Sequence, residues 1–138
     1  MKKIFVAIAS LLMLSSCATT PKSDEALNPV ATEYLLAYQS PPHADYGTII
    51  VKRDSGFLGA GCRDGIFVDG KLAVKIGVGE IAKLYVPVGE HLIGKGAGTG
   101  LCGGGMLEQS VVIENGVTRR FRISGDLGSG FHLAPTSQ

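Results

Sequence analysis

Short segments with alternating apolar and polar residues run through the chain from residue 47 onward. Residues 72–76 (LAVKI) and 82–86 (AKLYV) show the pattern most clearly. Successive side chains of a strand point to opposite faces, so this period of two predicts strands with one buried face. Turn residues separate the segments, and no stretch between them is long enough for the helix of a β-α-β unit. The pattern therefore predicts an all-β fold, an antiparallel β-sandwich or small barrel of about eight short strands.

Two glycine-containing pairs predict tight hairpins. Asp69-Gly70 lies between two apolar segments, and glycine tolerates the positive φ that a two-residue loop requires. Asn115-Gly116 predicts a second hairpin between residues 106–113 and 117–123. A three-residue loop at 114–116 would pair Ile113 with Val117, Val111 with Arg119 and Leu107 with Ile123, which collects the apolar residues on one face. We therefore expect a G1 bulge with Gly116 at positive φ.

A change in composition marks the expected start of the domain. Residues 19–46 contain no glycine, whereas all 20 glycines lie between Gly47 and Gly130. We therefore assign residues 47–134 to the sandwich and residues 135–138 to a polar tail. Residues 17–46 would then form a tether.

The end of this glycine-free segment also carries a helical pattern. Asn28-Pro29 offers an N-cap followed by a proline in the first turn, and Val30, Tyr34 and Tyr38 recur at a helical spacing. The spacing predicts a short helix of about three turns. An extended segment lying on the sheet is the alternative, because so short a helix is marginal without tertiary support.

The first residues follow the pattern of an export signal. Lys2 and Lys3 precede an apolar run at 4–14 that is too short to span a bilayer. The run ends in Leu14-Ser15-Ser16-Cys17, which resembles the lipobox of bacterial lipoproteins. The resemblance implies that residues 1–16 are removed and that Cys17 is acylated. Because Ala18 stands where an Asp would retain the protein in the inner membrane, it also implies the periplasmic face of the outer membrane. An ordinary signal peptide with an incidental cysteine is the alternative.

The charge balance gives no indication of a polyanionic partner. The loss of Lys2 and Lys3 with the signal lowers the formal charge from +1 to −1. Net charge therefore favours neither nucleic acid nor another polyanion. The sequence has no Trp and few other aromatic residues, so we expect a core of Val, Ile and Leu.

Two turn sequences in the middle of the chain resemble those of PEGA-like domains. They are Val68-Asp69-Gly70-Lys71 and the segment 86–93 (VPVGEHLI). PEGA-like units recur in small bacterial envelope lipoproteins. The resemblance implies a small β-sandwich at the envelope surface, usually without enzymatic activity, and it assigns no functional residue.

Cys62 and Cys102 are the two thiols that remain once Cys17 is acylated. In an oxidising compartment we expect them to form a disulfide. Metal ligation is the weaker alternative, because neither Cys-x-x-Cys nor a nearby His supports it. Redox catalysis is weaker still.

The glycine-rich segment 89–105 contains two sequences that only formally match nucleotide-binding motifs. GEHLIGK lacks the hydroxyl residue after its lysine, and GTGLCG is followed by a strand pattern rather than by a helix. We therefore expect no nucleotide and no other cofactor. A flexible loop is the simpler interpretation, and a ligand-contacting loop that includes Lys95 and Thr99 is the alternative.

Arg119, Arg120 and Arg122 form the densest basic cluster. Alternation places Arg120 and Arg122 opposite Phe121, where they could bind anionic groups or simply face solvent. Arg119 falls on the apolar face, so we expect it near the sheet edge or paired with an acid.

Residues suited to catalysis are scattered along the chain. The three histidines, His43, His91 and His132, lie in different segments, and no G-x-S-x-G occurs. We expect His91 to be a hydrogen-bonded strand residue, and we predict neither a metal site nor catalytic residues.

Three functional hypotheses follow. The first is a non-catalytic envelope lipoprotein that acts as a surface-anchored binding or scaffolding module for an envelope protein. Its binding surface would be the glycine-rich loops around Cys62 and Cys102, or Arg120 and Arg122. The second is an inhibitor of an envelope or secreted hydrolase, with the loop at 95–105 filling the active site. The third, an enzyme acting on envelope polymers, lacks a visible catalytic constellation.

Overall fold

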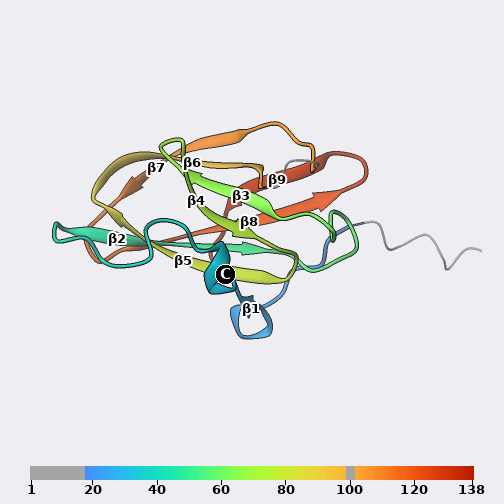
Figure 1. Ribbon diagram of the computed structural model, residues 1–138, viewed down its shortest axis with the longest axis horizontal. Coiled ribbons are helices and arrows are strands. Elements are labelled where there is room, and N and C mark those ends of the chain that lie inside the picture. The colour runs from blue at the N-terminus through green and yellow to red at the C-terminus, as the bar shows by residue number, and fades with distance from the viewer. Residues whose placement is uncertain (1–17, 99–101) are drawn as a thin grey trace, which may run out of the picture.

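The computed structural model describes residues 18–98 and 102–138, which form a β-sandwich (Figure 1). Five strands pair in the order β1-β5-β2-β8-β9, and four pair in the order β4-β3-β6-β7. Neither sheet closes into a barrel, so the predicted sandwich is confirmed. The strands are β1 (Asn28–Pro29), β2 (Tyr46–Arg53), β3 (Asp64–Val68), β4 (Lys71–Ile76), β5 (Glu80–Pro87), β6 (Gly89–Ala97), β7 (Leu107–Ile113), β8 (Thr118–Asp126) and β9 (Gly130–Pro135).

The five-stranded sheet is mixed rather than purely antiparallel. β8 runs parallel to β2, with Thr48 opposite Thr118 and Arg53 opposite Ile123. The two-residue strand β1 is parallel to β5, whereas the other pairs in both sheets are antiparallel. Parallel neighbours need a long connection, and the chain between β2 and β8 supplies one by building β5 and the whole four-stranded sheet.

The hairpin at Asp69-Gly70 is confirmed. It joins β3 to β4, and both turn residues have positive φ, 50° and 76°, as a type I′ turn requires. Asp69 tolerates this conformation because its carboxylate accepts a hydrogen bond from the backbone N–H of Leu92, at 2.8 Å. The turn thus connects the hairpin to the neighbouring strand β6.

The predicted pairing of the second hairpin is wrong, although its turn is correct. Gly116 has φ 71°, and Val117 N–H donates to Glu114 O at 3.1 Å. The strands on either side nevertheless join different sheets: Ile113 pairs with Gly89 in β6, and Arg119 pairs with Ile49 in β2. Alternation could not reveal this, because a strand shows the same period of two whichever sheet it joins.

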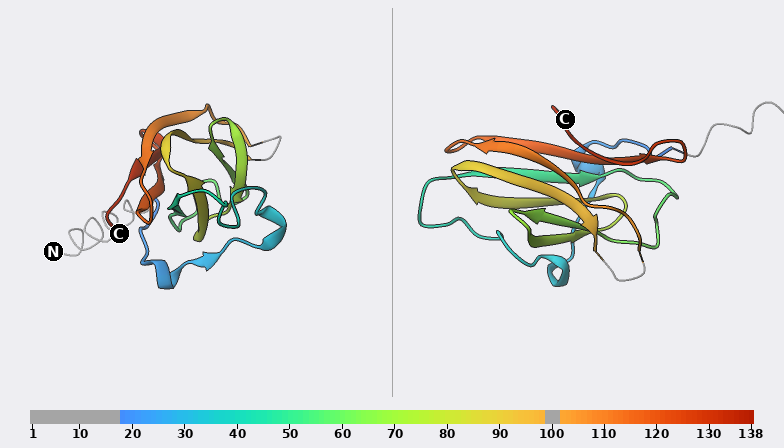
Figure 2. Two further views of the ribbon diagram at one scale, coloured as in Figure 1. Left: turned by 90° about the vertical axis from the view of Figure 1, so that its left-hand side faces the viewer. Right: turned by 90° about the horizontal axis from the view of Figure 1, so that it is seen from above.

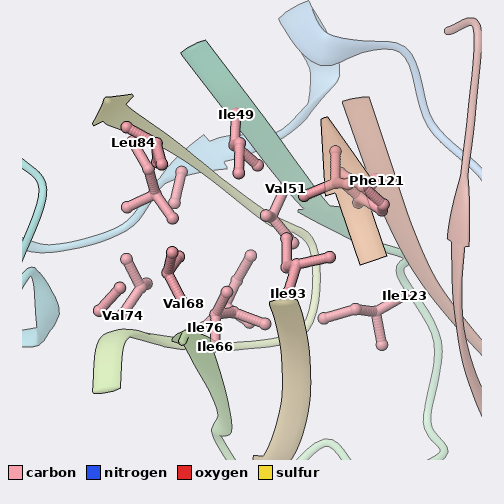
Figure 3. Packing of buried hydrophobic residues seen from close by; sticks show 14 of the residues in the cluster. Ile49, Val51, Ile66, Val68, Val74, Ile76, Leu84, Ile93, Phe121 and Ile123 are labelled. Carbon is pink, nitrogen blue, oxygen red and sulfur yellow. The ribbon is translucent and has the colours of Figure 1, made fainter. Parts of the chain in front are cut away.

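The core lies between the sheets and is almost entirely aliphatic, as the composition predicts. Ile49, Val51 and Phe121 of the five-stranded sheet point toward Ile66 and Ile93 of the other (Figure 3). These side chains have at most 3% of their surface exposed. Burying one such side chain contributes about 1.5–3 kcal/mol. The predicted inward faces therefore hold for most positions of both sheets, with Leu107, which is 39% exposed, as an exception.

The short helix predicted to begin at Asn28-Pro29 and to include Tyr38 does not form. Two 3-10 turns, η1 (Asp24–Ala26) and η2 (Thr32–Tyr34), and the short strand β1 occupy this region. The extended alternative is therefore the better description of the segment. Val30 of this segment is buried in the core. Tyr38 has φ 59°, a value outside the range of a right-handed helix. Local helix propensity is too weak over so few residues to resist packing on the sandwich.

The polar residues expected to form a tether are also bound to the sandwich. Thr19 N–H donates to Gly125 O at 2.9 Å, and Thr20 N–H donates to Ser55 O at 2.6 Å. Leu27 is buried. After η2 the chain runs around the side of the sandwich (Figure 2), and Leu35 forms a β-bridge with Val74 of β4. We call residues 18–39 the strap.

The other boundaries differ little from those expected. β2 begins at Tyr46, and β9 extends to Pro135, one residue into the expected tail. Thr136 N–H donates to Arg120 O at 3.0 Å, so the tail begins against β8. Across residues 18–98 and 102–138 no helix is long and apolar enough to cross a membrane.

Candidate functional site

Arg120 and Arg122 point away from the core, as predicted, but both are bound by acids of the same face. Arg122 donates two hydrogen bonds to the carboxylate of Asp54, at 2.8 and 2.6 Å, and Asp54 itself is 2% exposed. Arg120 forms an ion pair with Asp24 of the strap. These arginines therefore hold the strap and the sheet together, which leaves them less able to bind an external anion.

The strap is fastened at the same place by Lys52. Its ammonium group lies 3.3 Å from the carboxylate of Asp24 and 3.3 Å from Lys22 O. Burial alone would raise the pKa of Asp24, but hydrogen bonds and charge from Arg120 and Lys52 outweigh burial and lower it. Asp24 is therefore ionised at neutral pH and joins two strands through the strap.

Lys95, which we expected on a binding loop, lies inside the sandwich. It is 3% exposed, and its ammonium group is 2.9 Å from Asp64 and 4.5 Å from the ring centre of Phe131. Arg53 approaches the same carboxylate at 3.2 Å and donates to Cys62 O at 2.7 Å. The prediction for Lys95 is wrong because β6 continues to Ala97, so a residue assigned to a loop is an inward-facing strand residue.

The disulfide between Cys62 and Cys102 is confirmed, with the two Cα atoms 5.7 Å apart. It joins the loop after β2 to the loop between β6 and β7. Thr99 and Cys17 lie outside the described residues. A protruding inhibitory loop would therefore start beyond Ala97 rather than at Lys95.

A largely apolar concave surface lies on the outer face of the five-stranded sheet. A cavity of about 440 Å³ opens between the strap and strands β2 and β5. We call it the strap groove. Its walls combine apolar side chains with three that carry polar groups, and they are formed by Pro29, Val30, Leu35, Gln39, Ile50, Ile81, Ala82, Lys83 and Tyr85.

Lys83 and Tyr85 give the strap groove its polar chemistry. The ammonium group of Lys83 lies 5.0 Å from the ring centre of Tyr85, and Tyr46 meets that ring edge to face at 5.7 Å. Lys83 is exposed and belongs to none of the ion pairs formed within residues 18–98 and 102–138. The groove can thus receive an apolar group next to an acidic one. Sequence analysis missed it because the strap was expected to be a tether.

A second cavity, of about 530 Å³, opens where β7 meets β8 and the C-terminal residues. It is more polar, and Arg119 and Arg120 line it together with Ser110 and Thr118. Arg119 pairs with Glu114 at 2.6 Å, as the sequence predicted for this residue. Because both arginines have acidic partners, the strap groove offers the freer cation.

One group of residues resembles a catalytic triad in composition only. Ser129 donates to Asp126 and lies 2.8 Å from His132 Nε2, in the turn between β8 and β9. In a hydrolase triad the histidine stands between the serine and the acid. Here the hydrogen bond from the Ser129 hydroxyl, together with those from the backbone N–H groups of Ser129 and Gly128, lowers the pKa of Asp126 and stabilises the turn.

His91 and Glu80 each form hydrogen bonds within the sandwich. His91 in β6 is hydrogen-bonded, as predicted: its Nδ1 lies 2.6 Å from Asp69 and its Nε2 lies 2.8 Å from Pro87 O. Glu80 accepts both ends of the Arg63 guanidinium, at 2.7 and 2.9 Å. In the part of the chain that the structure describes, no three potential ligands gather closely enough to hold a metal ion.

Comparison with protein-family models, curated proteins and solved structures gave no match for this chain. The resemblances to the lipobox and to PEGA-like turns therefore rest on the residues that carry them.

Proposed function

We propose that the protein is an outer-membrane lipoprotein that faces the periplasm and acts as a non-catalytic binding or scaffolding module. The observation that carries the proposal is the Leu14-Ser15-Ser16-Cys17 sequence, placed directly before a compact sandwich. The disulfide supports it, because such bonds persist in oxidising compartments such as the periplasm. The protein would bind lipid through acylated Cys17, and the sandwich would carry the partner site.

We propose the strap groove as the surface that binds an envelope protein. Tyrosine, which lines the groove, is enriched in protein interfaces, and Lys83 adds a cation without an internal acidic partner among the described residues. A partner segment that presents an apolar side chain beside an Asp or Glu would match this chemistry. The acid–base groups found in the structure serve turns and ion pairs, which favours binding over catalysis.

Anchoring is tested first. Produced in a Gram-negative bacterium, the protein should fractionate with the outer membrane, and its N-terminal peptide should carry the mass of acyl chains on Cys17. The Cys17→Ser variant should lose both properties. A wild-type protein that accumulates without lipid in the periplasm would contradict the proposal.

Partner binding is tested by purifying the protein from crosslinked envelopes. Lys83→Glu should reduce recovery of the partner, whereas Glu108→Lys, a charge reversal at an exposed residue of β7 in the other sheet, should leave recovery unchanged. Equal recovery with both variants would place the binding surface elsewhere. Recovery of a hydrolase whose activity the protein blocks would support inhibition instead, and turnover of an envelope polymer would support an enzyme.

A further inference from the structure

The beginning of the strap is tied to one end of the sandwich. Ala18 forms an antiparallel bridge with Asp126 of β8, and Thr20 forms one with Ser55 in the loop that follows β2. Thr19 lies between these bridges, and its hydroxyl accepts a hydrogen bond from Gly125 N–H at 2.9 Å. Residues 18–20 are thus part of the folded body.

The two segments that hold residues 18–20 also carry exposed apolar side chains. Phe57, in the loop after β2, is 94% exposed, and Leu127, next to Asp126, is 68% exposed. The other exposed large apolar side chains in the described ranges have at most 55% of their surface exposed. Both segments lie at the same end of the sandwich, beside the point where the described chain begins (Figure 2).

The two loops that carry these side chains contain no charged residue. Residues 55–62 (SGFLGAGC) include no charged residue, and neither do residues 127–131. The nearest acid in sequence, Asp126, has its carboxylate occupied by N–H groups of its own turn and by Ser129. Exposed aromatic and aliphatic residues on uncharged loops are suited to the boundary between lipid headgroups and acyl chains.

The geometry points to this end of the sandwich as a membrane-docking surface that places Phe57 and Leu127 in the lipid interface. The inference rests on the proposed acylation of Cys17. Cys17 precedes Ala18, Ala18 is bridged to Asp126, and Asp126 precedes Leu127. Consecutive Cα atoms are about 3.8 Å apart and bridged Cα atoms about 5 Å, so the Cα atoms of Cys17 and Leu127 can be separated by no more than about 13 Å. Acyl chains inserted at Cys17 would therefore hold this end of the sandwich close to the bilayer.

Docking in this way fixes the orientation of the module. The turn that contains Val88 lies at the opposite end of β5 and β6 and would face the periplasm. The strap groove lies on the outer face of the five-stranded sheet, so it would remain accessible to a partner. The short attachment would also keep the partner close to the membrane.

Single tryptophan residues can test this orientation, because the chain contains no Trp of its own. Acylated full-length Phe57→Trp, Leu127→Trp and Val88→Trp proteins would be placed in phosphatidylethanolamine–phosphatidylglycerol vesicles that contain lipid brominated near the headgroup end of its acyl chains. We expect F57W and L127W to emit at shorter wavelength and to be quenched. V88W, whose native residue is 43% exposed, should emit as in water and remain unquenched.

The outcomes separate this inference from the proposed function. Acyl mass on Cys17 together with water-like emission from F57W and L127W would overturn the docking surface and leave the lipoprotein proposal standing. Quenching of V88W to the same degree would also overturn it. A protein without acyl mass on Cys17 would contradict the lipoprotein proposal and the docking surface together. Circular dichroism should show the same β-sheet signal for all three variants.

Discussion

The ion pair between Asp54 and Arg122 should be one of the most stabilising polar contacts of the molecule. The substitution Asp54→Asn keeps the size of the side chain but removes its charge and one of its two acceptors. Arg122 donates two hydrogen bonds to Asp54, and charge-assisted bonds of this kind contribute about 1.5–3 kcal/mol each. Arg122 is 33% exposed, so water screens part of the effect. We expect Asp54→Asn to lower the free energy of unfolding by about 2–3 kcal/mol.

The pair between Arg119 and Glu114 provides a matched control. It joins the same chemical groups at 2.6 Å, but the two side chains are 42% and 58% exposed. Glu114→Gln should therefore cost less than about 1 kcal/mol. Urea unfolding of both variants with the disulfide intact, analysed with a common m value, gives the comparison.

The reasoning depends on burial rather than on the presence of an ion pair. It would be refuted if Asp54→Asn and Glu114→Gln had the same effect, or if Asp54→Asn cost less than about 1 kcal/mol. A double-mutant cycle with Arg122→Met isolates the coupling, because Asp54 also accepts a hydrogen bond from Thr19 at 3.0 Å. That third contact should appear as a cost of Asp54→Asn that persists in the Arg122→Met background.

Three further predictions concern other parts of the sandwich. The disulfide closes a loop with a sequence separation of 40 and so restricts the unfolded chain. Replacing Cys62 and Cys102 by Ala should therefore lower the free energy of unfolding by about 4 kcal/mol in the urea assay. An unchanged urea midpoint would contradict this argument. Gly98→Ala would place a Cβ 2.6 Å from a backbone oxygen and should destabilise strongly in thermal unfolding, whereas Gly103→Ala, with open space around it, should be nearly neutral. A hydrogen bond from an imidazole lowers the pKa of Asp69, so this carboxylate stabilises the fold above its unfolded-state pKa and the stabilisation is lost as pH falls through the lower folded pKa. Asp69→Asn should therefore reduce the fall in Tm below about pH 4, and an unchanged pH profile would show that the hydrogen bond is not coupled to folding.

Turn chemistry was the most predictive local signal. Asp69-Gly70 and Gly116 have the positive φ values expected of them, because few residues other than glycine, asparagine and aspartate adopt that conformation at low cost. The partner of a strand is not a local property. Ile113 and Val117 flank a correctly predicted turn, yet they lie in or beside strands of different sheets, and only the packing of the whole chain selects that arrangement.

For the candidate sites too, the sequence predicted the face on which a residue lies but not its partners. Arg120 and Arg122 lie on the predicted face, but their acidic partners, Asp24 and Asp54, are 96 and 68 residues away in sequence. No spacing rule relates residues so far apart. Lys95 was misplaced because its glycine neighbours suggest a loop, whereas in β6 those glycines allow neighbouring side chains to cover the sheet.

The sequence by itself determined the all-β class, most inward faces of the strands and the tightest turns, which follow from a period of two and from glycine stereochemistry. The pairing of Cys62 with Cys102 was expected on the premise, taken from the lipobox resemblance, that Cys17 is acylated. Only the tertiary structure decided that residues 18–39 form a strap, that a groove lies beneath it and that Phe57 and Leu127 flank its beginning. These features depend on contacts between segments that are distant in sequence. Such contacts offset the entropy cost of ordering the chain only when both sheets are assembled.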